Sequence, residues 1–273
     1  MFIPFGFMAG EVASASYLLD DYGSATVAYS LRKLSSSSTN AIRVRRSSDN
    51  TEQDIGFVGE DLDTSALTTF TGAGEGYITK WYDQSGNSND AIQTTTSAQP
   101  LIVSGGTVES VNSKSAINFN GTTDYFDLTS AIATQGTSAA FAYVLNRATT
   151  GIKQATLGSG TSTPYGPYWF SDNNVYYAPQ TSGGAGRPSG ATGQNLVFLD
   201  APSSPFQLYI NGTQISAGGG GFGGTASTYI YFGRRAAEYA NGKYQEFILW
   251  DSNESSNRTG IESNINTYYT IYP

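Results

Sequence analysis

The sequence predicts an all-β sandwich, on the evidence of its composition, its segment pattern and its length. It has 32 Gly, 13% aromatic residues and only 13% charged residues. Short alternating or aromatic-rich segments are separated by turn-forming Gly, Asn, Ser and Pro, as in antiparallel β proteins. Such sandwiches often run past about 200 residues as one domain. We therefore expect a single sandwich domain over residues 23–273, preceded by an arm and linker at residues 1–22.

The first regular element expected is a short helix at residues 24–34. Val27, Leu31 and Leu34 are spaced i, i+4 and i+7, which places them on one helical face. Ser24 has a side chain suited to the N-cap.

Ten strands should follow this helix, and the clearest local signal among them is a hairpin. Asn211-Gly212 separates two alternating segments, and this dipeptide favours a type I′ turn because both central residues need positive φ. The expected strands are 42–46, 77–82, 116–119, 125–128, 139–146, 194–199, 206–210, 213–216, 229–232 and 243–250.

A helix is expected near the C-terminal end, at residues 255–269. Ile261, Ile265 and Tyr268 share one face of it, which should pack against the sandwich.

Charge and residue usage exclude several classes of function. The net charge of −8 disfavours a nucleic-acid partner, because the phosphate backbone repels an acidic surface. The arginines at 43 and 45 alternate with apolar residues, so they are expected on the solvent side of a strand. The chain has neither Cys nor His, so catalytic dyads or triads that use either residue, and zinc sites built from them, are excluded.

The first residues are apolar, with Phe2, Ile3, Phe5 and Phe7 close together. The stretch is much shorter than the roughly 20 residues of a membrane span. We expect an assembly arm that buries these side chains against another subunit, or an arm folded back on its own domain.

The segment Trp81-Tyr82-Asp83-Gln84-Ser85-Gly86-Asn87-Ser88-Asn89-Asp90 is the most informative motif. Trp81 and Tyr82 should pack the sandwich. Asp83, Gln84, Gly86 and Asn87 should turn the chain, since Asp and Asn side chains bond nearby backbone N–H groups and Gly supplies positive φ. Metal or substrate binding by Asp83 is the alternative.

Two groups of carboxylates are candidates for binding calcium, which takes six to eight oxygen ligands. They are Asp49, Glu52 and Asp54, and the pair Asp61 and Asp63. Neither has the Gly-centred spacing of a calcium-binding hand, so solvated loop carboxylates are expected. No metal and no cofactor is predicted.

An aromatic group with polar neighbours is the best sequence candidate for carbohydrate binding. Aromatic ring faces stack on sugars while amides and carboxylates hold hydroxyl groups. A core of aromatic strands is the alternative. The candidate residues are Tyr165, Tyr168, Trp169, Asp172 and Tyr177.

The motif Tyr82-Asp83-Gln84-Ser85-Gly86-Asn87, with Tyr29-Ser30 and residues 41–49, resembles the catalytic domain of α-L-arabinofuranosidase B. The resemblance is most specific over residues 24–100. It implies a concanavalin A-like, laminin-G-like jelly-roll sandwich with a short N-terminal-side helix and a C-terminal helix.

The resemblance also implies a retaining glycosidase, which needs two carboxylates about 5 Å apart. Here the sequence departs from the family. The segment most similar in sequence to the family's nucleophile segment is 169–175. It has amides and Asp172 where the family's nucleophile would be Glu, and no Glu occurs between Glu109 and Glu238. No catalytic residue is therefore assigned.

Residues 18–57 and 81–89 are also similar to sandwich proteins of tailed phages. This second resemblance implies a virion location, other virion proteins as partners, a homo-oligomer such as a trimer, and contact with host-surface glycans. We therefore expect a non-enzymatic virion structural protein, such as a fibre, spike or decoration. A glycoside hydrolase of arabinofuranosidase type and a free carbohydrate-binding module are the alternatives. Neither a nucleic-acid partner nor a membrane span is expected.

Overall fold

The computed structural model describes residues 16–134, 138–148, 154–160, 167–169, 175–176, 193–201, 207–217 and 227–273. The helical segments in this part are α1 (Leu18–Asp21), α2 (Thr64–Thr71), the 3₁₀ turn η1 (Thr96–Ala98) and α3 (Arg258–Tyr269). The strands are β1 (Val27–Ser30), β2 (Asn40–Arg46), β3 (Glu52–Val58), β4 (Asp61–Leu62), β5 (Gly76–Trp81), β6 (Ala91–Ile92), β7 (Leu101–Ser104), β8 (Thr107–Val108), β9 (Ser110–Val111), β10 (Lys114–Ser115), β11 (Ile117–Asn120), β12 (Phe126–Thr134), β13 (Ala139–Arg147), β14 (Gln154–Ala155), β15 (Leu157–Gly158), β16 (Tyr168–Trp169), β17 (Val175–Tyr176), β18 (Gly193–Ala201), β19 (Gln207–Ile210), β20 (Thr213–Ala217), β21 (Ser227–Phe232), β22 (Arg234–Arg235), β23 (Glu238–Tyr239) and β24 (Asn241–Trp250).

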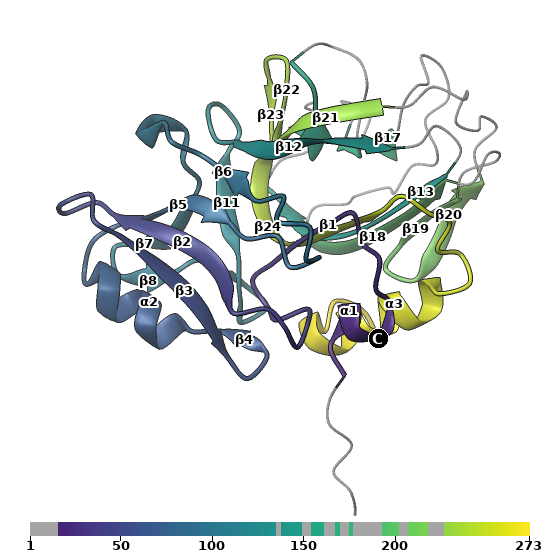
Figure 1. Cartoon of the computed structure of the whole chain (residues 1–273), viewed down its shortest axis with the longest axis horizontal. Helices are drawn as coiled ribbons and strands as arrows, with labels where there is room; N and C mark the ends of the chain where they lie inside the picture. The colour runs from purple at the N-terminus through teal and green to yellow at the C-terminus, as the bar shows by residue number, and fades with distance from the viewer. Residues whose placement is uncertain are drawn as a thin grey trace, which may run out of the picture.

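One layer of the sandwich is organised around β24, its longest strand (Figure 1). Strand β13 pairs with one edge of β24, and β1 and β11 pair with the other edge. From β13 the layer continues through β18 and β19 to β20. All these pairings are antiparallel. Strands β19 and β20 form a local hairpin, whereas β1, β11 and β13 come from distant parts of the chain to pair with β24.

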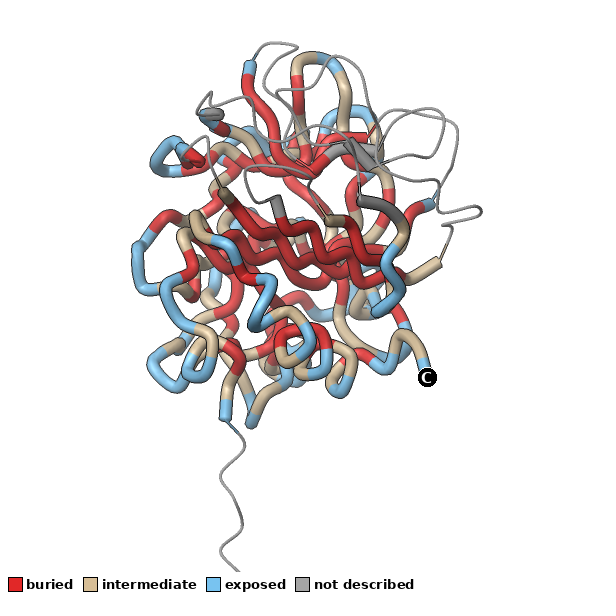
Figure 2. The backbone as a smooth tube through the Cα atoms, turned by 90° about the vertical axis from the view of Figure 1, so that its right-hand side faces the viewer, coloured by how far each residue is buried: buried red, intermediate tan, exposed pale blue. Residues whose placement is uncertain are grey.

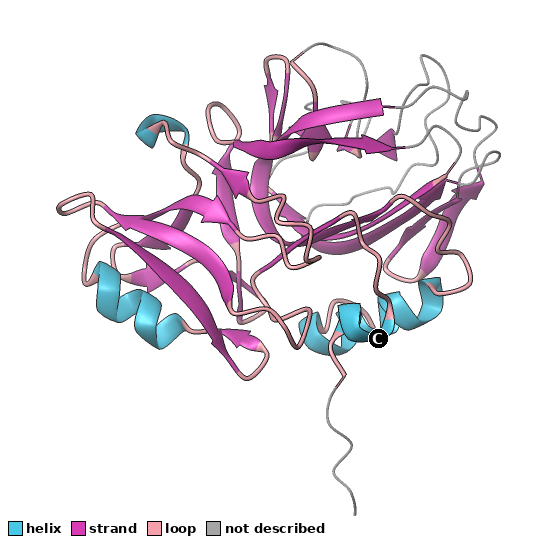
Figure 3. Cartoon of the chain, viewed as in Figure 1, coloured by secondary structure: helices cyan, strands magenta, loops and turns pink. Residues whose placement is uncertain are grey.

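The second layer contains β2, β5, β6, β12 and β21 (Figure 3). Strand β2 lies between β3 and β5, and β5 also pairs with β6 and β7. The sheet then continues from β6 through β12 and β21 to β15. Strand β11 joins the layers, because it pairs with β7 and with β24. This antiparallel sandwich confirms the predicted jelly-roll-like all-β fold.

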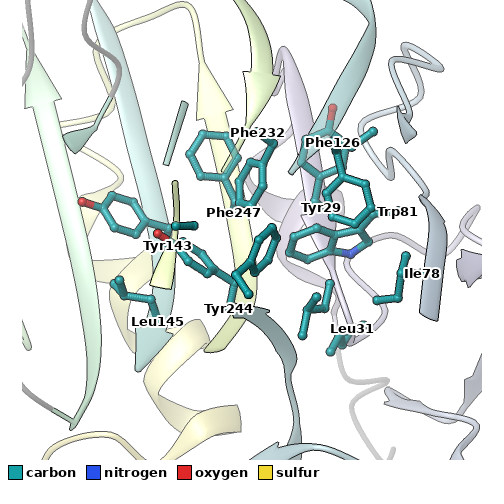
Figure 4. Packing of buried hydrophobic residues seen from close by; sticks show 14 of the residues in the cluster. Tyr29, Leu31, Ile78, Trp81, Phe126, Tyr143, Leu145, Phe232, Tyr244 and Phe247 are labelled. Atoms are coloured by element: carbon teal, nitrogen blue, oxygen red, sulfur yellow. The ribbon is translucent and has the colours of Figure 1, made fainter. Parts of the chain in front are cut away.

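The strands between the two layers are buried (Figure 2), and the core there is rich in aromatic rings (Figure 4). Tyr29, Trp81, Phe232 and Phe247 are all fully buried. The ring centroids of Tyr29 and Trp81 lie 5.5 Å apart, and those of Phe232 and Phe247 lie 5.3 Å apart in an edge-to-face arrangement. These separations are in the favourable range for aromatic pairs. The high aromatic content of the sequence is thus used mainly inside the sandwich.

A second core lies between β13 and the C-terminal helix α3, so β13 is buried on both faces. Ala140, Ala142 and Val144 share a hydrophobic cluster with Ile261 and Ile265 of α3. The alternate β13 side chains belong to the inner core: Ala139, Phe141, Tyr143 and Leu145. Successive strand residues point to opposite faces, so α3 is what covers the outer face. The predicted C-terminal helix and its packing on the sandwich are confirmed.

The predicted helix at residues 24–34 is wrong. Residues Val27–Ser30 form β1, which pairs antiparallel with β24 in the register Val27↔Leu249 to Ser30↔Glu246. All four residues of β1 are buried. A strand covered on both faces shows a continuous apolar run instead of alternation, and such a run does not distinguish strand from helix.

The predicted hairpin at Asn211-Gly212 is confirmed. It connects β19 and β20, with φ of 52° at Asn211 and 73° at Gly212, as a type I′ turn requires. Each of the other predicted strands overlaps an observed strand, with ends that differ by a few residues.

The sequence interpretation missed helix α2. Its N-cap is Asp63, whose carboxylate accepts a hydrogen bond from the backbone N–H of Ala66 at 2.8 Å. Leu67 and Phe70 turn inward and join the inner core. An N-cap Asp followed by apolar residues four and seven positions later is a helix signal that was available in the sequence.

Candidate functional site

A row of four side chains forms the floor of a cavity on the outer face of the second layer. Arg45 on β2 is paired with Tyr77 on β5, Tyr77 with Leu101 on β7, and Leu101 with Asn118 on β11. Paired residues in a sheet project from the same face. The other face of these strands carries core side chains and is packed against α2, as Figure 1 shows.

Loops form the walls of this cavity, which has a volume of about 700 Å³. We call it the Arg45 cavity. Its lining is Arg45, Asn50, Glu75, Tyr77, Thr96, Ser97, Gln99, Leu101, Asn118, Asn120 and Asp124. The volume falls in the range of small-molecule sites, and the lining combines an aromatic ring with amides, hydroxyls and both signs of charge. Such a lining suits a hydroxyl-rich ligand.

Arg45 is held rigidly although it has no carboxylate partner among the described residues. It is 8% exposed. Its Nε donates to Gln99 Oε1 at 2.7 Å, and its Nη1 donates to Asn50 Oδ1 at 2.8 Å. The guanidinium carbon lies 4.9 Å from the centroid of the Tyr77 ring, which is cation–π geometry. These contacts fix the direction of the guanidinium and leave Nη2 for a ligand.

Asp124 brings a carboxyl group with unusual proton affinity to the cavity wall. Burial raises its pKa to about 6, and the backbone N–H of Asn120, which donates to Oδ2 at 3.0 Å, only partly offsets that effect. The Nδ2 of Asn120 donates to the other oxygen at 2.7 Å. Close to neutral pH this carboxyl exists in both protonation states, so it can donate or accept a proton. Glu75 lines the same cavity.

The motif at residues 81–90 works as an internal clamp. The Asp83 carboxylate accepts hydrogen bonds from Ala28 N–H at 2.9 Å, Ser85 N–H at 2.9 Å, Ser85 Oγ at 2.8 Å and Asn89 N–H at 3.0 Å. Gly86 adopts positive φ at 90°. A carboxylate used by four donors of its own chain has little capacity left for a ligand, although Asp83 lines a hollow of about 360 Å³.

The neighbouring amides of the motif extend the clamp toward β1. The buried Gln84 side chain accepts from Leu34 N–H at 2.8 Å and donates to the carbonyls of Ser30 and Arg32, both at 3.0 Å. Asn87 Nδ2 donates to the carbonyl of Ala25 at 2.9 Å. The amides therefore hold the chain on both sides of β1.

The two aromatic side chains of the motif have different surroundings. Trp81 is fully buried in the core. Tyr82 lies on the outer face, where its hydroxyl donates to Asp54 Oδ1 at 2.7 Å and Lys80 Nζ lies 4.9 Å from its ring centroid.

The predicted carbohydrate-binding and arm residues lie mostly outside the described part. Tyr168 and Trp169 form β16, which pairs with β14 and β17. Outside the described residues are Tyr165, Asp172, Tyr177, Phe2, Ile3, Phe5 and Phe7. Within the part that is described, no helix has the length and apolar character to cross a membrane.

The carboxylates considered for calcium are engaged in contacts within the protein. Asp49 pairs with Arg46, Asp54 with Arg43, and Asp61 with Lys114. Asp63 caps α2. Among the residues with assigned structure, no three such side chains cluster in a way that could hold a metal ion.

The sequence interpretation did not identify the Arg45 cavity. Arg45 was expected on the solvent side of its strand, and it does occupy the outer face, but loops bury it there. Its alternation with Ile42 and Val44 was the only available signal. Asp124 gave none, because its burial comes from loop packing.

Comparisons with known proteins identify the fold. No protein-family model matches the sequence, and no curated protein matches it. Solved structures do match. A GH54 α-L-arabinofuranosidase soaked with a cyclic sulfate inhibitor is 18% identical, with a TM-score of 0.68, over 88% of this chain and 62% of that one. An arabinofuranosidase complexed with arabinofuranosyl-α-1,2-xylobiose is 19% identical, with a TM-score of 0.66, over the same shares.

A third match, a mutant GH54 α-L-arabinofuranosidase soaked with 4-nitrophenyl α-L-arabinofuranoside, has a TM-score of 0.68 at 18% identity, again covering 88% of this chain and 62% of that chain. The chain therefore spans less than two thirds of the length of these enzymes. The similarity confirms an arabinofuranosidase-like β-sandwich, as the motif at residues 82–87 suggested.

The prediction of a phage virion structural protein is wrong. The three solved structures named here, which share this fold over 88% of the chain, are arabinofuranosidases, and none is a virion component. The sequence predicted the fold correctly, but its similarity in sequence to phage sandwich proteins led to the wrong class of protein. The virion location, the trimer and the contact with host glycans have not been tested.

Proposed function

We propose that this protein binds a glycan in the Arg45 cavity. The observation that carries the proposal is the cavity floor, where an arginine, a tyrosine, a leucine and an asparagine form one row on one sheet face. Aromatic rings can contact the apolar face of a sugar, while guanidinium and amide groups hold its hydroxyls. The similarity in fold to arabinofuranosidases, which act on glycosides, is in keeping with this proposal.

Binding can be measured by isothermal titration calorimetry with arabinofuranosyl-xylobiose and a panel of neutral and acidic oligosaccharides. Replacing Tyr77 by Ala should weaken binding at least tenfold, because central Tyr and Arg side chains dominate binding energies. Tyr82→Ala is the matched control, since Tyr82 lies on the same sheet face but does not line the Arg45 cavity. If no glycan binds, or both variants bind like the parent, the proposal fails.

Hydrolysis of the bound glycoside is the second candidate, and Asp124 favours it. A general acid needs a carboxyl that retains its proton near the working pH, and Asp124 has a pKa of about 6. Glu75 lines the same cavity and supplies a second carboxylate. Glycosidases generally use such a pair, with one member as acid and the other as nucleophile or base.

The assay for hydrolysis is release of 4-nitrophenolate from 4-nitrophenyl α-L-arabinofuranoside. Activity should fall as the pH rises above about 6, because the acid must be protonated. Asp124→Asn and Glu75→Gln should each abolish turnover while leaving binding within a few-fold. Asp61→Asn is the control, because Asp61 pairs with Lys114 and does not line the cavity. Binding without turnover, unchanged by Asp124→Asn, leaves a carbohydrate-binding module as the function.

A further inference from the structure

A second arginine, Arg234 on β22, follows the end of β21 and is surrounded by tyrosines. The Arg234 guanidinium carbon lies 4.7 Å from the ring centroid of Tyr125, 4.9 Å from that of Tyr231 and 5.7 Å from that of Tyr239. The Tyr125 and Tyr231 rings meet edge to face at 5.5 Å. Arg234 and the three tyrosines are partly exposed. We call these four residues the Arg234 cluster.

Arg234 resembles Arg45 in having no ion pair with any described residue. Its Nε donates to the carbonyl of Ala236 at 3.1 Å, and its two terminal nitrogens make no hydrogen bond within the described structure. Asp127 is close enough to interact electrostatically but forms no ion pair with it. By contrast, Arg43 on the same face is bound by Asp54 through two hydrogen bonds, of 2.7 and 2.9 Å.

Unpaired arginines are unexpected on a chain with a net charge of −8. Acidic residues outnumber basic ones 22 to 14, so carboxylate partners are abundant. Planar stacking on tyrosine rings positions each guanidinium while its donors stay available. This is the arrangement expected of an arginine that receives an anionic group from a ligand.

The two arginines are connected across the sheet. Arg45 donates to Gln99 Oε1, and Gln99 Nε2 donates to the carbonyl of Gln93 at 2.9 Å. Gln93 Nε2 then donates to the carbonyl of Tyr125 at 2.9 Å, which leads into the Arg234 cluster. Asp124 of the cavity wall and Tyr125 of the cluster are consecutive residues. The Arg45 cavity and the Arg234 cluster are therefore adjacent.

The strand order gives the span between the arginines. Four pairings lead from β2 through β5, β6 and β12 to β21, the strand that ends just before Arg234. At about 4.8 Å for each pairing, their separation perpendicular to the strands is roughly 19 Å. A ligand that reaches both arginines is therefore a chain of several sugar units.

We propose that this face binds an anionic glycan, a chain whose carboxylate or sulfate groups pair with Arg45 and Arg234. The inference rests on the proposed glycan-binding function and adds the chemical class of the ligand. A guanidinium pairs with carboxylate or sulfate through two parallel hydrogen bonds, which gives both strength and orientation. Tyr77 and the tyrosines of the Arg234 cluster supply apolar contacts beside the charged groups.

The acidic groups around the two sites are compatible with an anion. Asp124 and Glu75 line the Arg45 cavity, and Asp127 lies beside Arg234. Burial raises the pKa of Asp124 to about 6 and raises that of Asp127 as well, although Arg234 opposes the shift at Asp127. Protonation of these carboxyls on approach of an anion removes repulsion and adds a hydrogen-bond donor. Binding should therefore strengthen as the pH falls toward 5.

The test compares oligogalacturonates, sulfated oligosaccharides and neutral arabino-oligosaccharides of equal length by calorimetry with the full chain. One anionic class should bind at least tenfold more tightly than the neutral class, and its affinity should fall as salt is added. The preferred class identifies the anion. Affinity should also increase with chain length until the ligand reaches both arginines.

Arg45→Gln and Arg234→Gln should each weaken binding of the anionic glycan at least tenfold, and the double variant should remove its advantage over the neutral chain. Arg43→Gln is the matched control, because Arg43 is on the same face but already paired with Asp54. Arg234→Lys keeps the charge and loses the planar fork, so it should restore only part of the affinity. Thermal unfolding of every variant excludes misfolding.

The outcomes separate the two proposals. Equal binding of neutral and anionic chains, with loss on Tyr77→Ala, overturns the anionic ligand and keeps the glycan site. Anionic binding that is equally weakened by Arg43→Gln overturns the assignment to Arg45 and Arg234. Absence of binding to all three glycan classes overturns both proposals.

Discussion

Removing the charge of Glu246 should destabilise the protein strongly, because Glu246 forms a buried ion pair with Arg32. Glu246 is fully buried and Arg32 is 1% exposed. Glu246 Oε2 accepts from Arg32 Nε at 2.7 Å and from Ser30 Oγ at 2.8 Å, and Oε1 accepts from Arg32 Nη2 at 3.1 Å. Burial alone would lower the pKa of Arg32, but Glu246, with smaller contributions from Tyr269 and Glu60, outweighs that effect and raises it.

The expected cost of Glu246→Gln follows from these contacts. Breaking a buried ion pair by removing one partner costs about 3–5 kcal/mol. In Glu246→Gln the side-chain amide has only one acceptor oxygen, and its NH2 group would point toward the Arg32 guanidinium or leave one of its N–H donors without an acceptor. Arg32 keeps a second partner, Glu60, at 2.7 Å, which is 36% exposed and partly compensates. We therefore expect a loss of about 3 kcal/mol, near the lower end of the range.

Urea unfolding at pH 7 with linear extrapolation measures this loss. The melting temperature should fall by about 6–12 °C, at 2–4 °C per kcal/mol for a chain of this size. Glu60→Gln is the control and should cost less than about 1 kcal/mol, because Glu60 is partly exposed to solvent. The double variant Arg32→Met with Glu246→Leu should recover most of the loss, since no buried charge is left unpaired. A cost below 1 kcal/mol for Glu246→Gln, or equal costs for Glu246→Gln and Glu60→Gln, would refute this reasoning.

Two further predictions concern Asp83 and Asp200. Asp83→Ala should lower the free energy of unfolding by about 2–3 kcal/mol, because four donors lose their acceptor. Asp83→Asn should cost roughly half as much. Urea unfolding that places both variants within about 0.5 kcal/mol of the parent, which is the effect of an ordinary surface substitution, would contradict the clamp. Burial raises the pKa of Asp200 to about 6, and the hydrogen bond from the backbone N–H of Glu254 offsets only part of that effect. The stability that this protonated carboxyl contributes is present below about pH 4 and is lost as the pH rises through 6. Asp200→Asn should therefore be more stable than the parent by about 2–3 kcal/mol at pH 8 and close to it at pH 4, and a pH-independent difference would be the opposing result.

Local chemistry was enough to predict several elements. Asn211-Gly212 specified its hairpin because few other residue pairs tolerate positive φ twice in succession. The face formed by Ile261 and Ile265 specified α3, because helical periodicity is a property of the sequence itself. The motif at residues 82–87 indicated the type of β-sandwich through its resemblance to arabinofuranosidases, and the solved structures with this fold bear out that type of sandwich.

Prediction failed where burial comes from distant segments. The residues of β1 are covered on one side by the inner core and on the other by the cluster under α3, so their apolar spacing resembled that of a helix. The prediction of the protein class failed for a different reason. Sequence motifs shared among sandwich proteins reflect their common fold and do not identify their function.

The sequence by itself determined the all-β class, the absence of Cys- and His-based chemistry, the hairpin and the closing helix. These follow from composition and from neighbours along the chain. Only the tertiary structure decided that Arg45, Tyr77, Leu101 and Asn118 lie in one row, because strand register sets that row and no local pattern encodes it. It also decided that Asp124 would hold its proton up to about pH 6, since the desolvation that raises its pKa depends on the groups packed around it.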